Sequence, residues 1–66
     1  MHLIINGEQR EVADACTVTA LLEELQIRAV RVAVEVNLDI VPKARYADHC
    51  LQDGDRIEIV HFVGGG

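Results

Sequence analysis

The chain has 66 residues and a formal net charge of −5, with 11 acidic side chains against 6 basic ones. A chain of this length forms one thin core and has no room for a deep substrate cavity. Its negative charge repels nucleic-acid phosphates, so no nucleic-acid partner is expected. Half of the residues are hydrophobic, which argues against disorder, and no apolar run or leader indicates a membrane or secretion. We therefore expect a cytoplasmic protein.

The first predicted elements are two short strands joined by a tight turn. The run Leu3-Ile4-Ile5 has a strand-like composition and is followed by Asn6-Gly7, the pair preferred where both central residues of a hairpin turn need positive φ. Residues 8–12 form the returning strand, and Asp14-Ala15-Cys16 ends the strand pattern. The sequence thus predicts an N-terminal β-hairpin.

An amphipathic helix is predicted over residues 18–26. The Thr17 hydroxyl can accept a hydrogen bond from an unpaired backbone N–H at the helix start. Apolar residues then recur at i, i+3, i+4 and i+7 and form one stripe: Val18, Leu21, Leu22 and Leu25. No glycine follows this stripe, so the helix end is poorly marked. We expect the stripe to lie across a sheet.

A second hairpin follows in the middle of the chain. Alternation of valines with smaller or charged residues predicts a half-buried strand over residues 32–36, which turns at Asn37-Leu38-Asp39. Ile40-Val41 begins a short return. Pro42 ends it, because proline cannot donate to a sheet ladder.

The last segment completes the predicted fold. One short helical turn is expected within residues 44–50, and the turn Asp53-Gly54-Asp55 precedes a final strand over 56–62. The order β, β, α, β, short β, β is that of an α+β, β-grasp (ubiquitin-like) fold, a small mixed sheet with one helix packed across one face. The first and last strands are then central parallel neighbours. Residues 1–63 form the domain and 64–66 a flexible glycine tail.

Strand parity predicts an exposed apolar patch beside this tail. If Leu3 and Ile5 face the helix, Ile4 faces solvent. The same alternation turns Val60 and Phe62 toward solvent on the last strand. We interpret Ile4, Val60 and Phe62 as a docking patch for partners. The alternatives are a sheet that is partly buried on both faces, or a Phe62 that folds back over the sheet edge.

The tail Gly64-Gly65-Gly66 carries the chemistry that the sequence suggests. Without Cβ atoms, an extended glycine tail can thread a narrow channel and bring its carboxylate to a nucleotide. An ionised carboxylate is a poor electrophile, whereas its mixed anhydride with AMP can be displaced by a sulfur nucleophile. Taken without the fold, a triple glycine is equally compatible with a loose end.

The sequence offers no catalytic set of its own. It shows no paired carboxylates, no Ser-His-Asp arrangement and no phosphate loop, so the chain is expected to be a carrier and not an enzyme. His2, His49 and His61 are widely spaced, and no metal site is predicted. Cys16 and Cys50 are interpreted as small apolar residues near the core.

The chain resembles the ThiS family, the sulfur carrier proteins of thiamin (thiazole) biosynthesis, over essentially its whole length. The most specific likeness lies in the C-terminal third, and Leu38 departs from the glycine that many relatives carry there. The segments that carry the resemblance are Asn6-Gly7, Thr17-Val18 with Leu21-Leu22 and Leu25, Ala33-Val34-Glu35-Val36-Asn37, Ile40-Val41-Pro42-Lys43, Leu51, Asp53-Gly54-Asp55, Ile57-Glu58-Ile59-Val60 and Val63-Gly64-Gly65-Gly66.

The resemblance implies a role for each tail residue and a set of partners. Gly66 would bear the adenylate and later the thiocarboxylate, while Gly64 and Gly65 would form the thin part that threads a channel. An E1-like adenylating enzyme would use ATP and magnesium, and the chain itself would bind no cofactor. A cysteine-derived sulfur donor would charge the tail, and thiazole synthase would accept the sulfur. The alternatives are a carrier for molybdopterin synthesis and a ubiquitin-like binding module or protein modifier.

Overall fold

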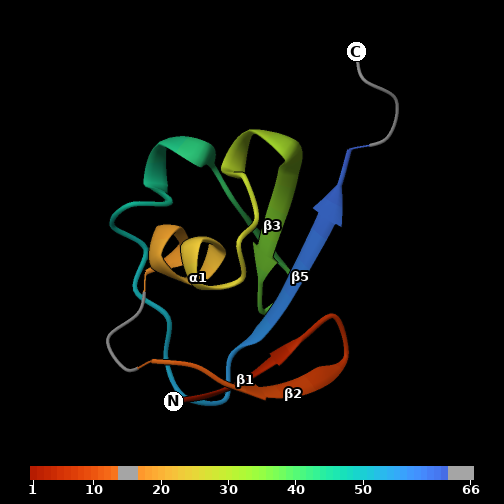
Figure 1. The fold of residues 1–66 in the computed structure, drawn as a ribbon, viewed down its shortest axis with the longest axis vertical. Helices are drawn as coiled ribbons and strands as arrows, with labels where there is room; N and C mark the ends of the chain where they lie inside the picture. Colours follow the sequence, from red (N-terminus) through yellow and green to blue (C-terminus); the bar gives the residue numbers. More distant parts are fainter. Residues whose placement is uncertain (14–16, 63–66) are drawn as a thin grey trace.

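The computed structural model describes residues 1–13 and 17–62. Within these ranges, a mixed five-stranded sheet in the order β2-β1-β5-β3-β4 is covered on one face by the helix α1 (Figure 1). This is the β-grasp arrangement that the sequence predicts. The strands are β1 (His2–Ile5), β2 (Glu8–Glu11), β3 (Val32–Val36), β4 (Asp39–Val41) and β5 (Arg56–His61).

The last strand, β5, lies in the middle of the sheet between β1 and β3. It runs parallel to β1, with Ile4 opposite Arg56, and antiparallel to β3, with Val34 opposite Ile59. The expected parallel pairing of the first and last strands is therefore confirmed. Strand β5, which precedes residues 63–66, is therefore the central strand of the sheet and is hydrogen-bonded to a neighbour on each side.

Two tight turns close the two hairpins with the same backbone geometry. Asn6 and Gly7 have φ values of 50° and 82° at the β1–β2 turn. Asn37 and Leu38 have φ values of 51° and 74° at the β3–β4 turn. Positive φ at both central residues matches the right-handed twist of the flanking strands, and it is the reason why Asn-Gly is favoured at such turns.

Helix α1 spans Val18–Glu24 and is shorter than the predicted 18–26. Its start is as predicted, since the Thr17 hydroxyl accepts a hydrogen bond from the Ala20 N–H at 3.1 Å. Its end is fixed by Gln26, which has a φ of 60° and donates its N–H to the Glu23 carbonyl. The Ile27 N–H bonds the Leu22 carbonyl, which completes a Schellman motif with glutamine in the place usually taken by glycine.

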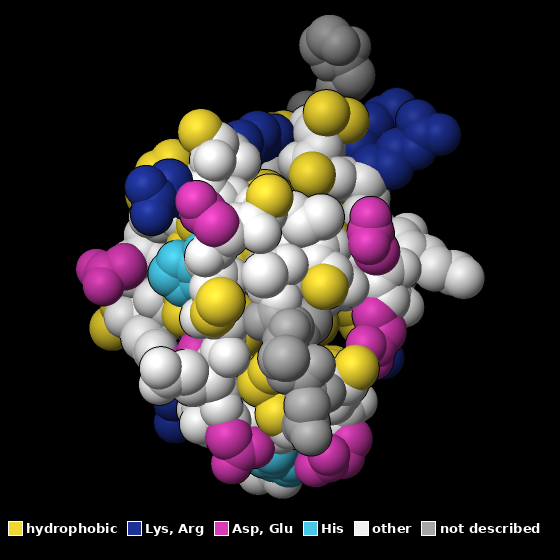
Figure 2. All heavy atoms as spheres, turned by 90° about the vertical axis from the view of Figure 1, so that its left-hand side faces the viewer, with side chains coloured by type: hydrophobic (Ala, Val, Ile, Leu, Met, Phe, Trp, Pro, Cys, Tyr) yellow, Lys and Arg dark blue, Asp and Glu magenta, His cyan; other side chains and the backbone are white. Residues whose placement is uncertain are grey.

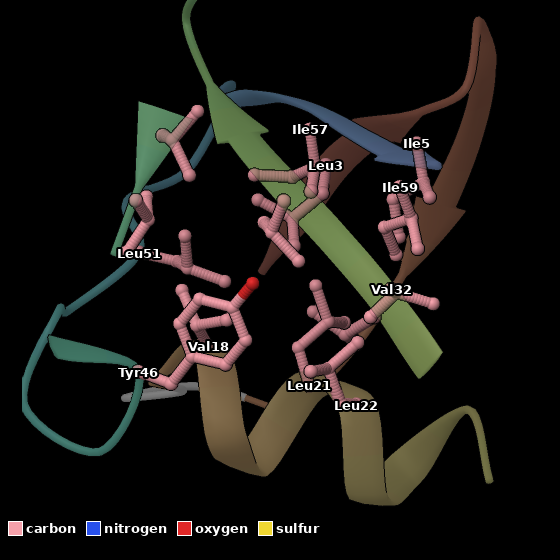
Figure 3. Packing of buried hydrophobic residues seen from close by; sticks show 14 residues of the cluster. Leu3, Ile5, Val18, Leu21, Leu22, Val32, Tyr46, Leu51, Ile57 and Ile59 are labelled. Carbon is pink, nitrogen blue, oxygen red and sulfur yellow. The ribbon is translucent and has the colours of Figure 1, made fainter. Parts of the chain in front are cut away.

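The core lies between α1 and the sheet and is almost wholly aliphatic (Figure 3). Tyr46 is the exception, with 3% of its surface exposed. Side chains that alternate along the strands enter this core, as parity predicts. Its fourteen buried members are Leu3, Ile5, Val12, Val18, Leu21, Leu22, Val32, Val34, Val36, Val41, Tyr46, Leu51, Ile57 and Ile59.

Two short 3₁₀ helices connect the main elements. One, η1 (Ala29–Arg31), was not anticipated from the sequence, and the other, η2 (Lys43–Arg45), begins just before the helical turn expected within 44–50. The expectation that Cys50 lies near the core is wrong. Its side chain is exposed, although its backbone forms an isolated antiparallel bridge with Thr17 at the start of α1. Cys16 lies outside the described residues.

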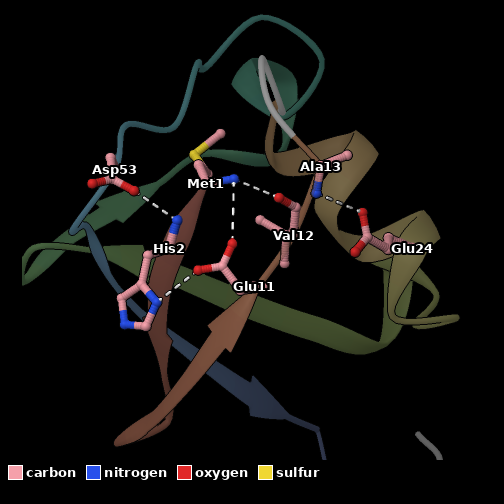
Figure 4. Close-up of polar contacts among 7 residues, drawn as sticks. All are labelled: Met1, His2, Glu11, Val12, Ala13, Glu24 and Asp53. Carbon is pink, nitrogen blue, oxygen red and sulfur yellow. Dashed lines mark hydrogen bonds and ion pairs between the residues drawn. The ribbon is translucent and has the colours of Figure 1, made fainter.

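Polar contacts tie the first strand to its surroundings (Figure 4). The Met1 amine donates to the Val12 carbonyl at 2.6 Å, and the His2 N–H donates to Asp53 Oδ1 at 2.7 Å. Glu11 Oε1 lies 3.1 Å from His2 Nδ1. The Met1 and Glu11 contacts close the open end of the β1–β2 hairpin, and the His2–Asp53 contact ties that end to the loop before β5. In the described part of the chain, no helix is long and apolar enough to cross a membrane.

Candidate functional site

The predicted reactive residues Gly64, Gly65 and Gly66 lie outside the described residues. The structure therefore describes the strand that leads to them and its surroundings. Phe62 is the last described residue, and its N–H donates to the Arg31 carbonyl at 2.9 Å. This bond continues the β3–β5 pairing by one step beyond His61. The last residue of η1 thus holds the backbone of Phe62, the residue that precedes 63–66.

The Asn6 side chain holds one edge of β5. Its Oδ1 accepts the Ile59 N–H at 2.7 Å, and its Nδ2 donates to the Ile59 carbonyl at 3.2 Å. Strand β1 has ended at Ile5, so the amide takes the place of the next strand residue. Sequence reasoning assigned Asn6 only to the turn. The available signal was that asparagine, unlike aspartate, presents both a donor and an acceptor.

The Asn37 side chain holds the other edge of β5. Its Oδ1 accepts the Arg56 N–H at 3.0 Å, and its Nδ2 donates to Asp55 Oδ1 at 3.0 Å. The Asn37 N–H also donates to the Arg56 carbonyl. Both asparagines sit at positive φ beside β5. The strand that precedes the tail is therefore fixed on both sides by amide groups as well as by its sheet neighbours.

The structure places Ile4, Val60 and Phe62 away from the core but not in one cluster. Val60 and Phe62 are 55% and 57% exposed, whereas Ile4 is half-buried. Ile4 lies opposite Arg56 at the start of β5, and Val60 follows four residues later, about 13 Å along the strand. Val60 and Phe62 therefore lie near the tail and Ile4 at the far end of β5. A docking role for these residues stays a prediction.

Lys43 lies against Phe62 and orients its ring. The Lys43 Nζ is 5.2 Å from the ring centroid, a cation–π geometry, and it donates a hydrogen bond to the Ala29 carbonyl at 3.0 Å. No contact was assigned to Lys43 from the sequence. Through these two contacts, Lys43 of η2 joins η1 to Phe62.

Basic side chains collect at the same end of the molecule. Arg28 and Arg31 line a hollow of about 330 Å³ that also includes His61 and Phe62. Figure 2 shows the helix side of the molecule, where basic side chains gather toward this end and hydrophobic side chains are mostly scattered. Arg28 and Arg31 thus give this end a local positive charge on a chain whose net charge is −5.

The described residues supply no further reactive group at this end. Among residues 1–13 and 17–62, no three His, Cys, Asp or Glu side chains come together as a metal site. Burial raises the pKa of the Tyr46 hydroxyl above 10.0, and a hydrogen bond to the Val34 backbone acts in the opposite direction. Tyr46 belongs to the core, so its shift reflects packing and not chemistry.

Comparison with known proteins gives a consistent result. The family model described as ThiS family matches residues 3–66. The Escherichia coli sulfur carrier protein ThiS is 36% identical over 66 residues, which cover all of both chains. A crystal structure of the thiamine biosynthesis protein ThiS from Geobacter metallireducens superposes with a TM-score of 0.87 at 35% identity, again over all of both chains.

A second kind of relative is much longer. A thiazole synthase from Paramagnetospirillum magneticum is 54% identical over all 66 residues of this chain, and the chain spans 20% of that protein. A thiazole synthase from Magnetococcus marinus is 39% identical over all 66 residues, and the chain again spans 20% of that protein. In these proteins a region similar to this chain is part of a longer polypeptide.

Proposed function

The chain belongs to the ThiS family, and on that premise we propose that it is a sulfur carrier of thiamin biosynthesis, a substrate of other enzymes and not a catalyst. The observation that carries this proposal is the likeness to the Escherichia coli sulfur carrier over all of both chains. The fold of the Geobacter metallireducens protein supports it independently. The alternatives are a carrier for molybdopterin synthesis and a ubiquitin-like modifier, and no observation favours either.

The proposed chemistry takes place on the terminal carboxylate of Gly66. The carboxylate attacks the α-phosphate of ATP on an adenylating enzyme, which forms the acyl adenylate and releases pyrophosphate. A sulfide equivalent from a cysteine-derived donor then attacks the carbonyl carbon and expels AMP. One C–O bond is replaced by a C–S bond, and the product is a thiocarboxylate. ATP and magnesium belong to the partner enzyme in this scheme.

The role of this chain is to present the tail. Gly64 and Gly65 give the tail the cross-section of bare backbone, so it fits a narrow channel. Strand β5 directs the tail, and Asn6 and Asn37 hold that strand in place. The reaction needs no catalytic side chain from the carrier, because activation comes from the nucleotide.

Thiazole synthase is the proposed acceptor of the sulfur. Two proteins named thiazole synthase contain a region similar to this chain within a longer polypeptide. Covalent linkage raises the effective concentration of two modules that act together, which supports a partnership between carrier and synthase. The adenylating enzyme and the cysteine-derived sulfur donor are proposed because the family resemblance implies them.

Intact-mass spectrometry tests the proposal directly. The protein is incubated with ATP, magnesium, a sulfide source and the adenylating enzyme of the same organism, and fragmentation then locates any change. We expect one oxygen-to-sulfur exchange at Gly66. Deletion of Gly66 is expected to abolish the exchange without loss of the fold. An unchanged mass, with the enzyme active on a known carrier, would instead favour a binding module with an inert tail.

A further inference from the structure

Lys43 is the only lysine of the sequence, and its place is set by the end of β4. Pro42 follows that strand, and its carbonyl accepts the Arg45 N–H at 2.8 Å, so η2 forms directly after the sheet edge. Helix η2 lies at the same end of the molecule as η1 and the end of β5 (Figure 1). The Lys43 side chain therefore reaches Phe62, the residue from which the tail continues.

The short helix η1 holds Phe62 at two points. The carbonyl of its last residue, Arg31, accepts the Phe62 N–H at 2.9 Å. The carbonyl of its first residue, Ala29, accepts a hydrogen bond from the Lys43 ammonium at 3.0 Å. The same ammonium lies 5.2 Å from the centroid of the Phe62 ring. The backbone of Phe62 is thus held against η1 directly, and its ring is held there through Lys43.

These contacts add little to the stability of the domain. Phe62 lies beyond β5, which ends at His61, and its side chain is 57% exposed. Lys43 is exposed as well. A cation–π contact or a single hydrogen bond on the surface contributes weakly to folding. The main effect of the Lys43 contacts is therefore to fix the orientation of Phe62, the last residue before 63–66.

We propose that Lys43 is a positioning residue for the reactions at Gly66, because it holds Phe62 in one orientation before any enzyme binds. This role rests on the proposed function, since it concerns the entry of the tail into an enzyme. Lys43 touches neither the nucleotide nor the reacting atoms in this scheme. It acts through Phe62 alone.

The benefit is a smaller ordering cost when the tail enters a channel. Each residue whose backbone becomes fixed on binding loses conformational entropy, and glycine loses the most. Gly64, Gly65 and Gly66 all contribute to that cost. A Phe62 that is already held in the free protein adds little to it, which is the advantage of a preorganised ligand. The gain is the same before and during the reaction, so it lowers KM and leaves kcat unchanged.

Three variants test the Lys43 ammonium in assays with the purified adenylating enzyme. Lys43→Met keeps the aliphatic stem and removes the charge and the donor, so we expect KM to rise about threefold at unchanged kcat. Lys43→Arg keeps a cation over the ring and should behave as the wild type. Arg45→Met removes the same charge from η2, at a side chain that pairs with Asp48 at 3.3 Å. It is the matched control and should leave KM unchanged.

A double-mutant cycle shows whether Lys43 acts through Phe62. Phe62→Leu keeps an apolar side chain and removes the aromatic face. In that background, Lys43→Met should cause no further rise in KM, because the contact is already lost. An equal rise in both backgrounds would mean that Lys43 contacts the enzyme directly, and it would overturn the proposal.

Thiazole synthase provides a second test, because the positioning belongs to the carrier and not to one interface. The thiocarboxylate form of Lys43→Met should therefore bind the synthase more weakly by the same factor of about three. If Lys43 instead paired with an acidic group of one enzyme, the loss would be confined to that enzyme and would depend on salt. A loss at one enzyme only thus contradicts the proposal.

NMR of the free protein detects the contact without any enzyme. The ring current of Phe62 should shift the Lys43 ε-methylene protons upfield, and Phe62→Leu should abolish the shift. Relaxation measurements should give the Phe62 amide a lower order parameter in Lys43→Met than in the wild type or in Arg45→Met. Equal order parameters in all three proteins would show that Lys43 does not hold Phe62 and would overturn the proposal.

The outcomes separate the positioning role from the proposed function. If the wild-type protein is not charged with sulfur at all, the proposed function fails and the positioning role fails with it. If the wild type is charged and Lys43→Met keeps its KM, only the positioning role is overturned. A fall in kcat at unchanged KM, or a Lys43→Arg variant as impaired as Lys43→Met, would also contradict that role.

Discussion

Asn6 accepts the Ile59 N–H and donates to the Ile59 carbonyl, so one side chain replaces a residue of β1. Asn6→Gly keeps the positive φ and removes the amide, which isolates the hydrogen bonds from the turn geometry. We expect a loss of about 2 kcal/mol in the free energy of unfolding, since two part-buried backbone groups lose their partners. Urea denaturation measures it. A variant as stable as the wild type would show that water replaces the amide at no cost.

Tyr46 is the residue whose ionisation is coupled to folding. Its pKa is raised by burial, so the folded state favours the neutral hydroxyl. The stability from this preference is fully present below about pH 10 and is lost as pH rises through the raised pKa. Urea denaturation of the wild type between about pH 8 and 11 should show this decline, and Tyr46→Phe should show a shallower one. Parallel curves for the two proteins would contradict the assignment.

The sequence predicted residue roles that depend on neighbours along the chain and missed those that depend on distant strands. Thr17 was recognised as a helix cap, because the N–H it accepts is three residues away. The bonds from Asn6 to Ile59 span 53 residues and follow only from the pairing of β1 with β5. Cys50 was misplaced as well, because residue type alone does not tell whether a cysteine is buried.

At the scale of the elements, the end of α1 offers a stabilising change. Gln26 adopts a φ of 60° in a Schellman motif where glycine has no Cβ penalty. We expect Gln26→Gly to raise the free energy of unfolding by about 0.5–1 kcal/mol. Urea denaturation gives the sign, and Gln26→Ala, which keeps the Cβ, is the control that should leave stability close to that of the wild type. If the glycine variant is less stable, the Gln26 side chain makes a compensating contact.

Element boundaries followed the strength of the local pattern. The valine alternation gave β3 as Val32–Val36 without error, because period-two patterning determines a strand directly. The helix was predicted two residues too long, since nothing in the sequence marks Gln26 as a residue with positive φ. The helix η1 has no periodic signal and appears only where the chain crosses from α1 to β3.

For the molecule as a whole, the sheet face away from α1 is the surface on which we predict that partners dock. Phe62→Asp puts a carboxylate on exposed surface near the tail, so we expect an intact fold and weaker binding to both proposed enzymes, by roughly tenfold or more. Isothermal titration with each enzyme measures the effect. Leu38→Asp, a similar change at the exposed β3–β4 turn at the other end of the sheet, should not weaken binding. Unchanged affinity of the Phe62 variant for both enzymes would exclude Phe62 from the docking surface.

The candidate site divides into a part that the sequence predicts and a part that it does not. The Gly64-Gly65-Gly66 tail is contiguous, so its chemistry follows from the order of residues alone. The contacts that hold β5 in place, such as those from Asn6 to Ile59, join residues 53 positions apart and depend on the β1–β5 pairing. Ile4 lies at the start of β5 and not on the tail side, a placement that parity alone could not give.

The central place of β5 also determines how the domain responds to mechanical tension. A partner that draws the tail into a channel pulls along β5, while the rest of the domain is held at the partner's surface. The hydrogen bonds to β1 and β3 run across that direction, so they are sheared together and do not open one after another. A terminal strand at the sheet edge would resist the same force with the hydrogen bonds of one neighbour only. The strand order thus increases the force along the tail that the carrier withstands before it unfolds.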